Sequence, residues 1–230
     1  MEKHLHKEIE KLKKKMLTLS AIAEERTTLA VKSLKEKDAK LAREVINRDF
    51  EIDEIEVELE EDCLKILALH QPVAIDLRFI VAALKINSEL ERIGDLAVNI
   101  AERAEVLASQ INLDIPPELS QMTQKAEEML RNSLDALINM DADLAYQVCE
   151  ADDEVDALNR DMYRLVEDKI EIYPDQIENL IHLLQTSRHL ERIADHATNI
   201  AEDVVYMIQG DIIRHHAEDY RLLSEKEKSD

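Results

Sequence analysis

The sequence contains few of the residues that interrupt regular secondary structure. Among 230 residues there are two glycines, four prolines, no tryptophan and only 3% aromatic residues. Strands joined by tight turns need such interruptions roughly every 8–12 residues, whereas long helices do not. The hydrophobic fraction of 45% comes largely from leucine, isoleucine and alanine. We therefore expect an all-α protein with an aliphatic core.

Cysteine and long apolar runs are equally scarce. Only Cys63 and Cys149 are present, and neither belongs to a CxxC pair. This predicts reduced, structural thiols of a cytoplasmic protein rather than a disulfide framework. No stretch approaches the ~18 apolar residues of a membrane span, and the N-terminal residues lack the apolar segment of a signal peptide. We expect a cytoplasmic protein that reaches a membrane only indirectly, through partners.

Positive charge is in short supply, because 29 basic residues stand against 51 acidic ones and give a formal net charge of −22. Such a surface does not attract phosphate backbones, so no nucleic-acid partner is expected. It can attract cations or a basic protein surface, although solvated helix faces alone account for much of this charge. Phosphate-binding loops and nucleophile elbows are also missing. The sequence therefore predicts a protein that is not an enzyme.

Apolar residues recur at helical spacing in six long segments. The segments are separated by Asp38, a natural N-cap, by Pro72 and Pro174, and by Gly210, which suits the position after a helix C-terminus. The expected helices cover residues 4–35, 39–69, 73–109, 118–139, 142–172 and 175–209.

The chain also repeats itself. The stretch that starts at Glu91, ERIGDLAVNIAE, returns 100 positions later as ERIADHATNIAE, starting at Glu191. Before the prolines of the turns the offset is 103, and a register change within a turn is typical of two homologous units. We predict a tandem repeat of two antiparallel three-helix bundles, residues 1–111 and 118–216, with a linker at 112–117 and a charged tail at 217–230.

Each half carries two pairs of acidic residues at i, i+4 spacing, on consecutive helices. Residues four apart share a helix face, and the short proline-containing turn makes the two helices antiparallel neighbours. Four carboxylates can then converge, and a cation relieves their repulsion. Oxygen ligands suit Mg²⁺, Mn²⁺ and Ca²⁺, or iron in an oxygen-rich cluster. The candidate ligands are Asp49, Asp53, Glu91, Asp95 and Asn99 in the first half, and Asp152, Asp156, Glu191, Asp195 and Asn199 in the second.

Two alternatives compete with these metal sites. One is a metal-free helical scaffold whose carboxylates are simply solvated. The other is a ferritin-like di-iron enzyme, which needs a glutamate three residues before a histidine on each of two helices. None of the eight histidines has one, so this alternative is the weaker. The spacing of His182, His189 and His196 predicts partly buried, hydrogen-bonded rings, with His196 kept as a possible ligand of the second site.

The repeated motif, the turn HQPVAIDLR from His70 to Arg78 and the pair Asp49 and Asp53 resemble the PhoU family of phosphate-transport regulators. The resemblance covers nearly the whole chain apart from its ends. It implies two three-helix bundles, each with a multinuclear metal cluster, containing Fe, Zn, Mn or Mg, at the carboxylate pairs. It also implies a cytoplasmic, commonly dimeric, negative regulator that acts with the phosphate ABC transporter ATPase and its sensor histidine kinase.

The second half departs from the family pattern at its turn. Tyr173-Pro174-Asp175-Gln176 replaces the sequence His-Gln-Pro-Val, and Glu178 stands where the first half has Arg78. The two metal sites are therefore not expected to be equal, and a partner contact at this turn is expected in the first half. The function that we expect is that of a metal-binding regulator of phosphate uptake and of phosphate-starvation signalling.

Overall fold

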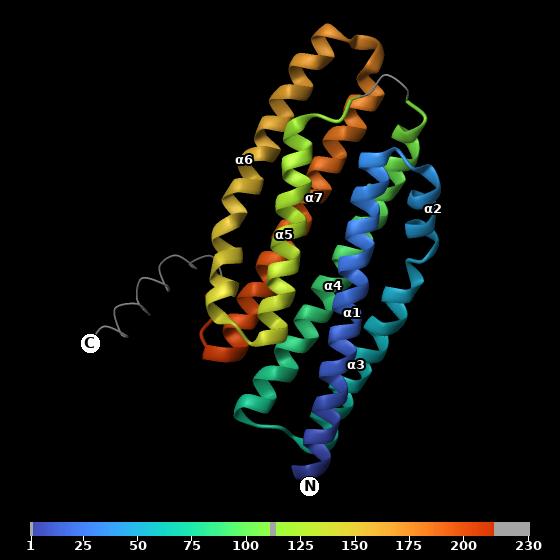
Figure 1. Ribbon diagram of the computed structural model, residues 1–230. Coiled ribbons are helices and arrows are strands. Elements are labelled where there is room, and N and C mark those ends of the chain that lie inside the picture. Colours follow the sequence, from blue (N-terminus) through green and yellow to red (C-terminus); the bar gives the residue numbers. More distant parts are fainter. Residues whose placement is uncertain (1, 111–113, 214–230) are drawn as a thin grey trace, which may run out of the picture.

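The computed structural model describes residues 2–110 and 114–213 of the chain. These residues contain seven α-helices and one short 3₁₀ helix (Figure 1). These residues contain no strand, which confirms the all-α prediction. The predicted tail at 217–230 and residues 112 and 113 of the predicted linker lie outside the described residues. The elements are α1 (Glu2–Glu36), α2 (Ala39–Asn47), α3 (Phe50–His70), α4 (Ala74–Ala108), α5 (Pro117–Asn139), α6 (Ala142–Ile172), η1 (Pro174–Gln176) and α7 (Ile177–Gln209).

Local capping signals set several helix ends. The Asp38 side chain accepts hydrogen bonds from the backbone N–H groups of Lys40 and Leu41, at 2.9 and 3.1 Å, and so satisfies two of the free donors at the start of α2. Asp141 caps α6 in the same way. Gly210 ends α7 with φ of 89°, a left-handed conformation that glycine adopts without strain.

The helix predicted over residues 39–69 is interrupted at Arg48 and Asp49, so this segment forms α2 and α3 instead of one helix. The Arg48 N–H bonds to the carbonyl of Val45 at 3.2 Å, and the Ile52 N–H bonds to that of Asp49 at 3.0 Å. Both bonds span three residues, which tightens the backbone locally. The apolar pattern conceals the interruption, because Val45 and Ile52 are both buried on either side of it.

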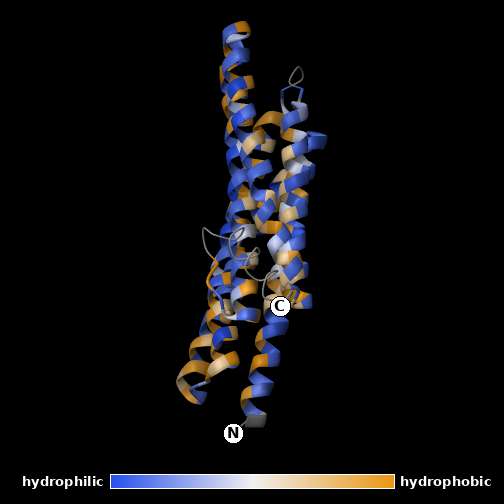
Figure 2. Ribbon diagram, turned by 90° about the vertical axis from the view of Figure 1, so that its left-hand side faces the viewer, coloured by the Kyte–Doolittle hydropathy of each residue, from blue (hydrophilic) through white to orange (hydrophobic). Residues whose placement is uncertain are grey.

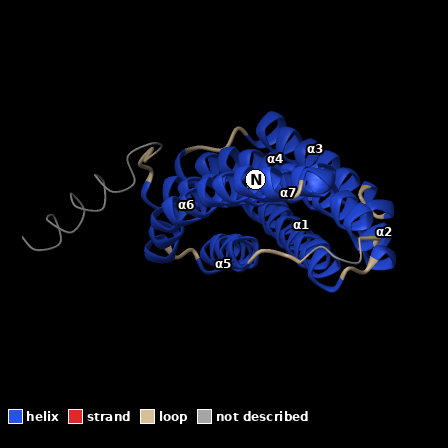
Figure 3. Ribbon diagram, turned by 90° about the horizontal axis from the view of Figure 1, so that it is seen from above, coloured by secondary structure: helices blue, strands red, loops and turns tan. Residues whose placement is uncertain are grey.

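The helices form two bundles that share one long contact. α1, α2, α3 and α4 pack together, α5, α6 and α7 pack together, and the bundles meet mainly along α4 and α7 (Figures 1 and 3). Lys85 near the start of α4 pairs with Asp203 near the end of α7 at 2.8 Å, so these helices are antiparallel. The tandem arrangement predicted from the sequence is therefore confirmed, and the two helices that carry the repeated motif lie against each other.

Glycine at position 94 allows α3 to approach α4 closely. A Cβ atom added there would lie 2.6 Å from Cδ1 of Ile52, closer than two carbon atoms can pack. In the second bundle the repeat equivalents of Gly94 and Ile52 are Ala194 on α7 and Val155 on α6, and both are buried. The additional methyl group of the pair thus belongs to Ile52 on α3 in the first repeat and to Ala194 on α7 in the second. Among the described helices, none combines the length and apolarity needed to cross a bilayer.

Candidate metal centres

The first group of predicted ligands lies where α3 faces α4. The pKa of Asp49 is raised by partial burial first and then by the negative charges of Asp53 and Asp95. The pKa of Glu91 is raised by partial burial and then by Asp95 and Asp53. Carboxylates on each of the two helices therefore raise the pKa of a carboxylate on the other helix. The structure brings the two predicted pairs close enough to repel each other.

The second group repeats this arrangement between α6 and α7. Burial, followed by the charges of Asp195 and Asp156, raises the pKa of Asp152 to about 6. The Thr198 hydroxyl donates a hydrogen bond to Asp152 at 3.3 Å and offsets part of this rise. Burial and then Asp156 raise the pKa of Glu191 as well. On this face, each ionised carboxylate therefore makes the ionisation of its neighbours less favourable.

The donor chemistry of both groups suits a hard cation, because carboxylate oxygens dominate and their mutual repulsion favours a positive charge between them. Within the described ranges, however, no three acidic, histidine or cysteine side chains are already arranged around a common point where a metal ion would be held. The eight predicted carboxylates thus form two electrostatically coupled groups rather than two finished coordination cages.

The two asparagines of the repeated motif differ in their surroundings. The Asn99 amide donates to the backbone carbonyl of Asp95 within its own helix at 2.8 Å. The Asn199 amide instead donates to Oε2 of Glu89 on α4, in the other bundle, at 3.1 Å. The second group is therefore connected directly to the contact between the bundles, and the first is not connected in this way.

His196 lies in the contact between the two bundles. Its Nδ1 atom is directed at Glu89 of α4 and not at the carboxylates of the second group. The ring is buried, and its Nδ1 lies 2.6 Å from Oε2 of Glu89. Burial of Glu89 works against its charge, but the hydrogen bonds from His196 and Asn199 prevail, so the pKa of Glu89 is lowered. The predicted buried, hydrogen-bonded histidine is present, whereas its suggested role as a ligand of the second site finds no support in this geometry.

Sequence reasoning missed two charged residues near these groups. Arg26 of α1 is almost fully buried, with ion pairs to Glu25 and Glu51, and its positive charge opposes the rise in the pKa of Asp49. Its position within the apolar stripe of α1 could have revealed it. Glu89 could have been found from its repeat equivalent, His189, because both fall on the core side of their helices. The pKa of His189 is lowered to about 4, by burial and then by Arg103.

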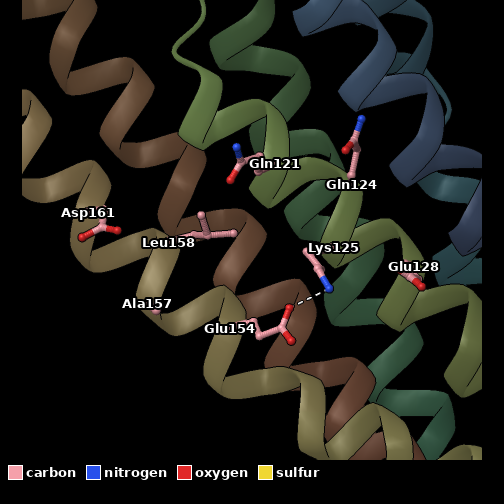
Figure 4. Close-up of a pocket in the computed structure, with 8 residues that line it drawn as sticks. All are labelled: Gln121, Gln124, Lys125, Glu128, Glu154, Ala157, Leu158 and Asp161. Atoms are coloured by element: carbon pink, nitrogen blue, oxygen red, sulfur yellow. Dashed lines mark ion pairs between the residues drawn. The ribbon is translucent and has the colours of Figure 1, made fainter.

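A wide groove between α5 and α6 contains none of the predicted ligands (Figure 4). Its volume is about 520 Å³, and an ion pair of 2.6 Å between Lys125 and Glu154 lies on it. Six of the eight residues that line it have polar or charged side chains, although most of the surface they present is apolar. Small-molecule sites are usually enclosed, whereas this groove is open to solvent, so it does not compete with the carboxylate groups as the candidate site.

Comparison with known proteins agrees with this geometry. The sequence model of one family, described as the PhoU domain, matches the chain twice, over residues 16–104 and 119–204. Each match contains one complete carboxylate group. The chain belongs to the PhoU family. The resemblance noted in the sequence is therefore confirmed.

Individual PhoU proteins match over almost the whole chain. The phosphate-specific transport system accessory protein PhoU homolog of Aquifex aeolicus is 39% identical over 211 residues, which cover 92% of this chain and 96% of that protein. The crystal structure of PhoU from Pseudomonas aeruginosa has a TM-score of 0.86 and 34% identity, covering 90% of this chain and 99% of that one.

A second solved structure agrees, that of the phosphate transport system regulatory protein PhoU from Streptococcus pneumoniae. Its TM-score is 0.80 and its identity 31%, covering 90% of this chain and 98% of that one. The names of these PhoU relatives describe accessory and regulatory proteins rather than enzymes. The prediction that the protein is not an enzyme is thereby confirmed.

Proposed function

We propose that this PhoU-family protein regulates phosphate uptake and represses the phosphate-starvation response from the cytoplasm. It does so by binding the ATPase of the phosphate ABC transporter and the sensor histidine kinase that works with it. The observation that carries this proposal is the double match to the PhoU domain, together with relatives that are named for the phosphate-specific transport system. We further propose that the protein acts as a homodimer.

The two carboxylate groups are proposed to bind metal ions, arranged as multinuclear clusters of Fe, Zn, Mn or Mg. The raised pKa values of facing carboxylates support this, because burial causes most of the rise and a cation would remove the part that comes from their mutual repulsion. When bound, the metal would supply positive charge and no redox or hydrolytic step. The residues that would hold it are Asp49, Asp53, Glu91, Asp95 and Asn99 in the first repeat and Asp152, Asp156, Glu191, Asp195 and Asn199 in the second.

The role proposed for these residues is to set the charge of the surface that they share. Without a cation, neighbouring carboxylates on α3 and α4, or on α6 and α7, repel each other and push the helices apart. With the charge neutralised, each pair of helices is held in one arrangement, which can be presented to a partner. A metal-free scaffold remains the alternative function, and binding to the same partners without metal is its distinguishing property.

Metal analysis and binding measurements test both parts of this proposal. We expect elemental analysis of the purified protein to find stoichiometric metal, and chelation to lower its melting temperature. Asp95→Asn combined with Asp195→Asn should lose the metal, whereas Glu36→Gln combined with Asp168→Asn, which removes two exposed carboxylates elsewhere, should keep it. No stoichiometric metal and an unchanged melting temperature would contradict the metal sites.

The regulatory role has a separate test. The wild-type protein should bind the purified ATPase and the cytoplasmic part of the kinase in calorimetry. Loss of metal in the double variant without loss of binding would make the sites structural and would support the scaffold alternative. Absence of binding to both proteins would contradict the regulatory proposal.

A further inference from the structure

Exposed large apolar side chains gather at the two ends of the molecule. Among the described residues, eight of seventeen such side chains belong to the turns between α3 and α4 and between α6 and α7 or to the helix ends beside them. These turns lie at opposite ends of the elongated bundle, and hydropathy colouring shows apolar residues at both (Figures 1 and 2). The eight are Leu69, Val73, Ile75 and Leu77 at the α3–α4 tip, and Ile172, Tyr173, Ile177 and Ile181 at the α6–α7 tip.

Grouped apolar side chains on the surface of a soluble protein mark sites of contact. At the α6–α7 tip, Ile172 is 65% exposed and Tyr173 is 48% exposed. The short helix η1, which begins with Pro174, connects the two long helices and fixes the turn that carries these side chains. Tyrosine is enriched among the residues that dominate binding energy at interfaces. The tip therefore has the composition of an interface core.

The α6–α7 tip also has a rim of one charge. Glu171, Asp175 and Glu178 are exposed beside the apolar residues. The sequence contains no lysine or arginine between Lys169 and Arg188. No ion pair between described residues includes any of the three. Their negative charge is therefore directed at solvent or at a partner.

The α3–α4 tip differs in charge although it occupies the same place in its repeat. Val73 and Ile75 are 75% and 67% exposed, but the start of α4 beside them contains Arg78 as well as Asp76. Arg78 stands where the other tip has Glu178. The sequence alone favoured this first turn as the partner contact. The acidic rim instead favours the α6–α7 tip, because it specifies a partner surface with positive charge.

We propose that the α6–α7 tip is a docking surface for a protein partner that presents an apolar cleft rimmed by lysine and arginine. Opposite charges at a rim steer association and fix its register, and the apolar centre supplies the affinity. An anionic lipid surface would be repelled by the same rim. A second copy of this chain meeting tip to tip would place like charges together. The inference rests on the proposed function, because the ATPase and the kinase are the partners in which such a cleft is sought.

Three variants and a matched control test the proposal in the full-length protein. Ile172→Ser combined with Tyr173→Ser removes the apolar centre, and Asp175→Lys combined with Glu178→Lys reverses the rim. Glu178→Arg alone copies the charge of the first tip and changes one exposed side chain, so it leaves the fold intact. The control is Val73→Ser combined with Ile75→Ser at the α3–α4 tip. Circular dichroism melts verify folding of every variant.

Binding is measured by calorimetry with the purified ATPase and with the cytoplasmic part of the kinase, at low and high salt. We expect the three α6–α7 variants to weaken binding to one of them by about tenfold or more, and the control to change it by less than about twofold. Wild-type binding should weaken as salt rises, and the variant with the reversed rim should lose this dependence.

Other outcomes overturn the proposal. Undiminished binding by the α6–α7 variants, or an equal loss in the control, shows that the tip is not the docking surface. Sedimentation of the wild-type protein with phosphatidylglycerol vesicles that the tip substitutions abolish assigns the tip to a membrane. A change of oligomeric state in the variants, with partner binding unchanged, assigns it to a second copy. If the wild-type protein binds neither partner, the proposed function itself fails, and the inference fails with it.

Discussion

Glu89 of α4 and His196 of α7 lie 2.6 Å apart in the contact between the two bundles, so a partly buried carboxylate and a buried imidazole join the repeats. Asn199 adds a hydrogen bond to the same oxygen at 3.1 Å. The first repeat has Leu96 where the second has His196, and the second has His189 where the first has Glu89. This polar connection therefore exists once in the molecule, although the repeat would allow it twice.

Replacement of Glu89 by alanine should destabilise the protein by about 1–3 kcal/mol, because the buried His196 ring would lose its hydrogen-bond acceptor. The free energy of unfolding in urea, followed by circular dichroism, measures the effect. Glu61→Ala serves as the control, since it breaks only an exposed ion pair with Lys65 and should change the stability by no more than about 0.5 kcal/mol. Equal effects of the two substitutions would contradict the structural role of Glu89.

The contact of Gly94 with Ile52 predicts a strong coupling between these positions. Gly94→Ala should destabilise the protein by about 1–2 kcal/mol, because overpacking against Ile52 outweighs the better helix propensity of alanine. Ile52→Val alone should cost about 0.5–1.5 kcal/mol. The double variant copies the pair Ala194 and Val155 of the second repeat, so it should be more stable than the sum of the two single effects predicts.

A double-mutant cycle, built from four urea unfolding curves, measures this coupling. The reverse exchange in the second bundle, Ala194→Gly with Val155→Ile, is the matched comparison and should show coupling of the same sign. Strict additivity of the Gly94 and Ile52 substitutions would mean that α3 and α4 can separate at no cost.

The raised pKa of Asp152 predicts how stability depends on pH when metal is removed by a chelator. A folded-state pKa of about 6, above the usual value of 3.8, means that the native protein binds this proton more tightly than the unfolded chain does. The group therefore contributes favourably at low pH, and this contribution is lost as the pH rises through about 6. Above that pH the ionised carboxylate destabilises the native state.

Asp152→Asn should accordingly stabilise the metal-free protein at pH 7.5 by about 1–2 kcal/mol, a value reduced for solvent screening. The gain should shrink as the pH is lowered through about 6 and should be smallest near pH 4. Urea unfolding of both proteins at several pH values gives the comparison. A constant difference across this range would show that the raised pKa of Asp152 is not its cause.

Both cysteines should be inert in the native protein. Burial raises the pKa of the Cys63 thiol and of the Cys149 thiol to about 12, so neither forms much thiolate at pH 8. We expect alkylation by iodoacetamide, followed by mass spectrometry, to leave both unmodified in the folded protein and to modify both in urea. Rapid modification of the folded protein would place a thiol in a more open or more positive environment than this fold provides.

Most features that depend on local sequence were predictable, with the interruption at Arg48 as an exception, and those that depend on contacts between bundles were not. Asp38 and Gly210 mark helix ends because capping involves only residues a few positions away. The interruption at Arg48 was not visible, since the buried residues Val45 and Ile52 continue the helical pattern across it. The partnership of Glu89 with His196 requires the antiparallel contact of α4 with α7, which no short stretch of sequence specifies.

The candidate site shows the same division. The spacing of Asp152 and Asp156, and of Glu191 and Asp195, was enough to place each pair on one helix face. The electrostatic interaction between the pairs on the two helices could also be predicted from the sequence, because the intervening turn is short. The different surroundings of Asn99 and Asn199 did not follow, since identical local motifs meet different neighbours where the helices cross.

The guanidinium group of Arg78, near the start of α4, lies against Gly210 at the end of α7, so closely that an added Cβ would lie 2.0 Å from Nη1. Ile213, just beyond, is buried in the common core. The last turn of the second repeat thus supports the first turn of the α4 helix, at the opposite side of the molecule from the α6–α7 tip. Removal of either repeat would expose buried residues of the other, so the two bundles should unfold in one cooperative transition.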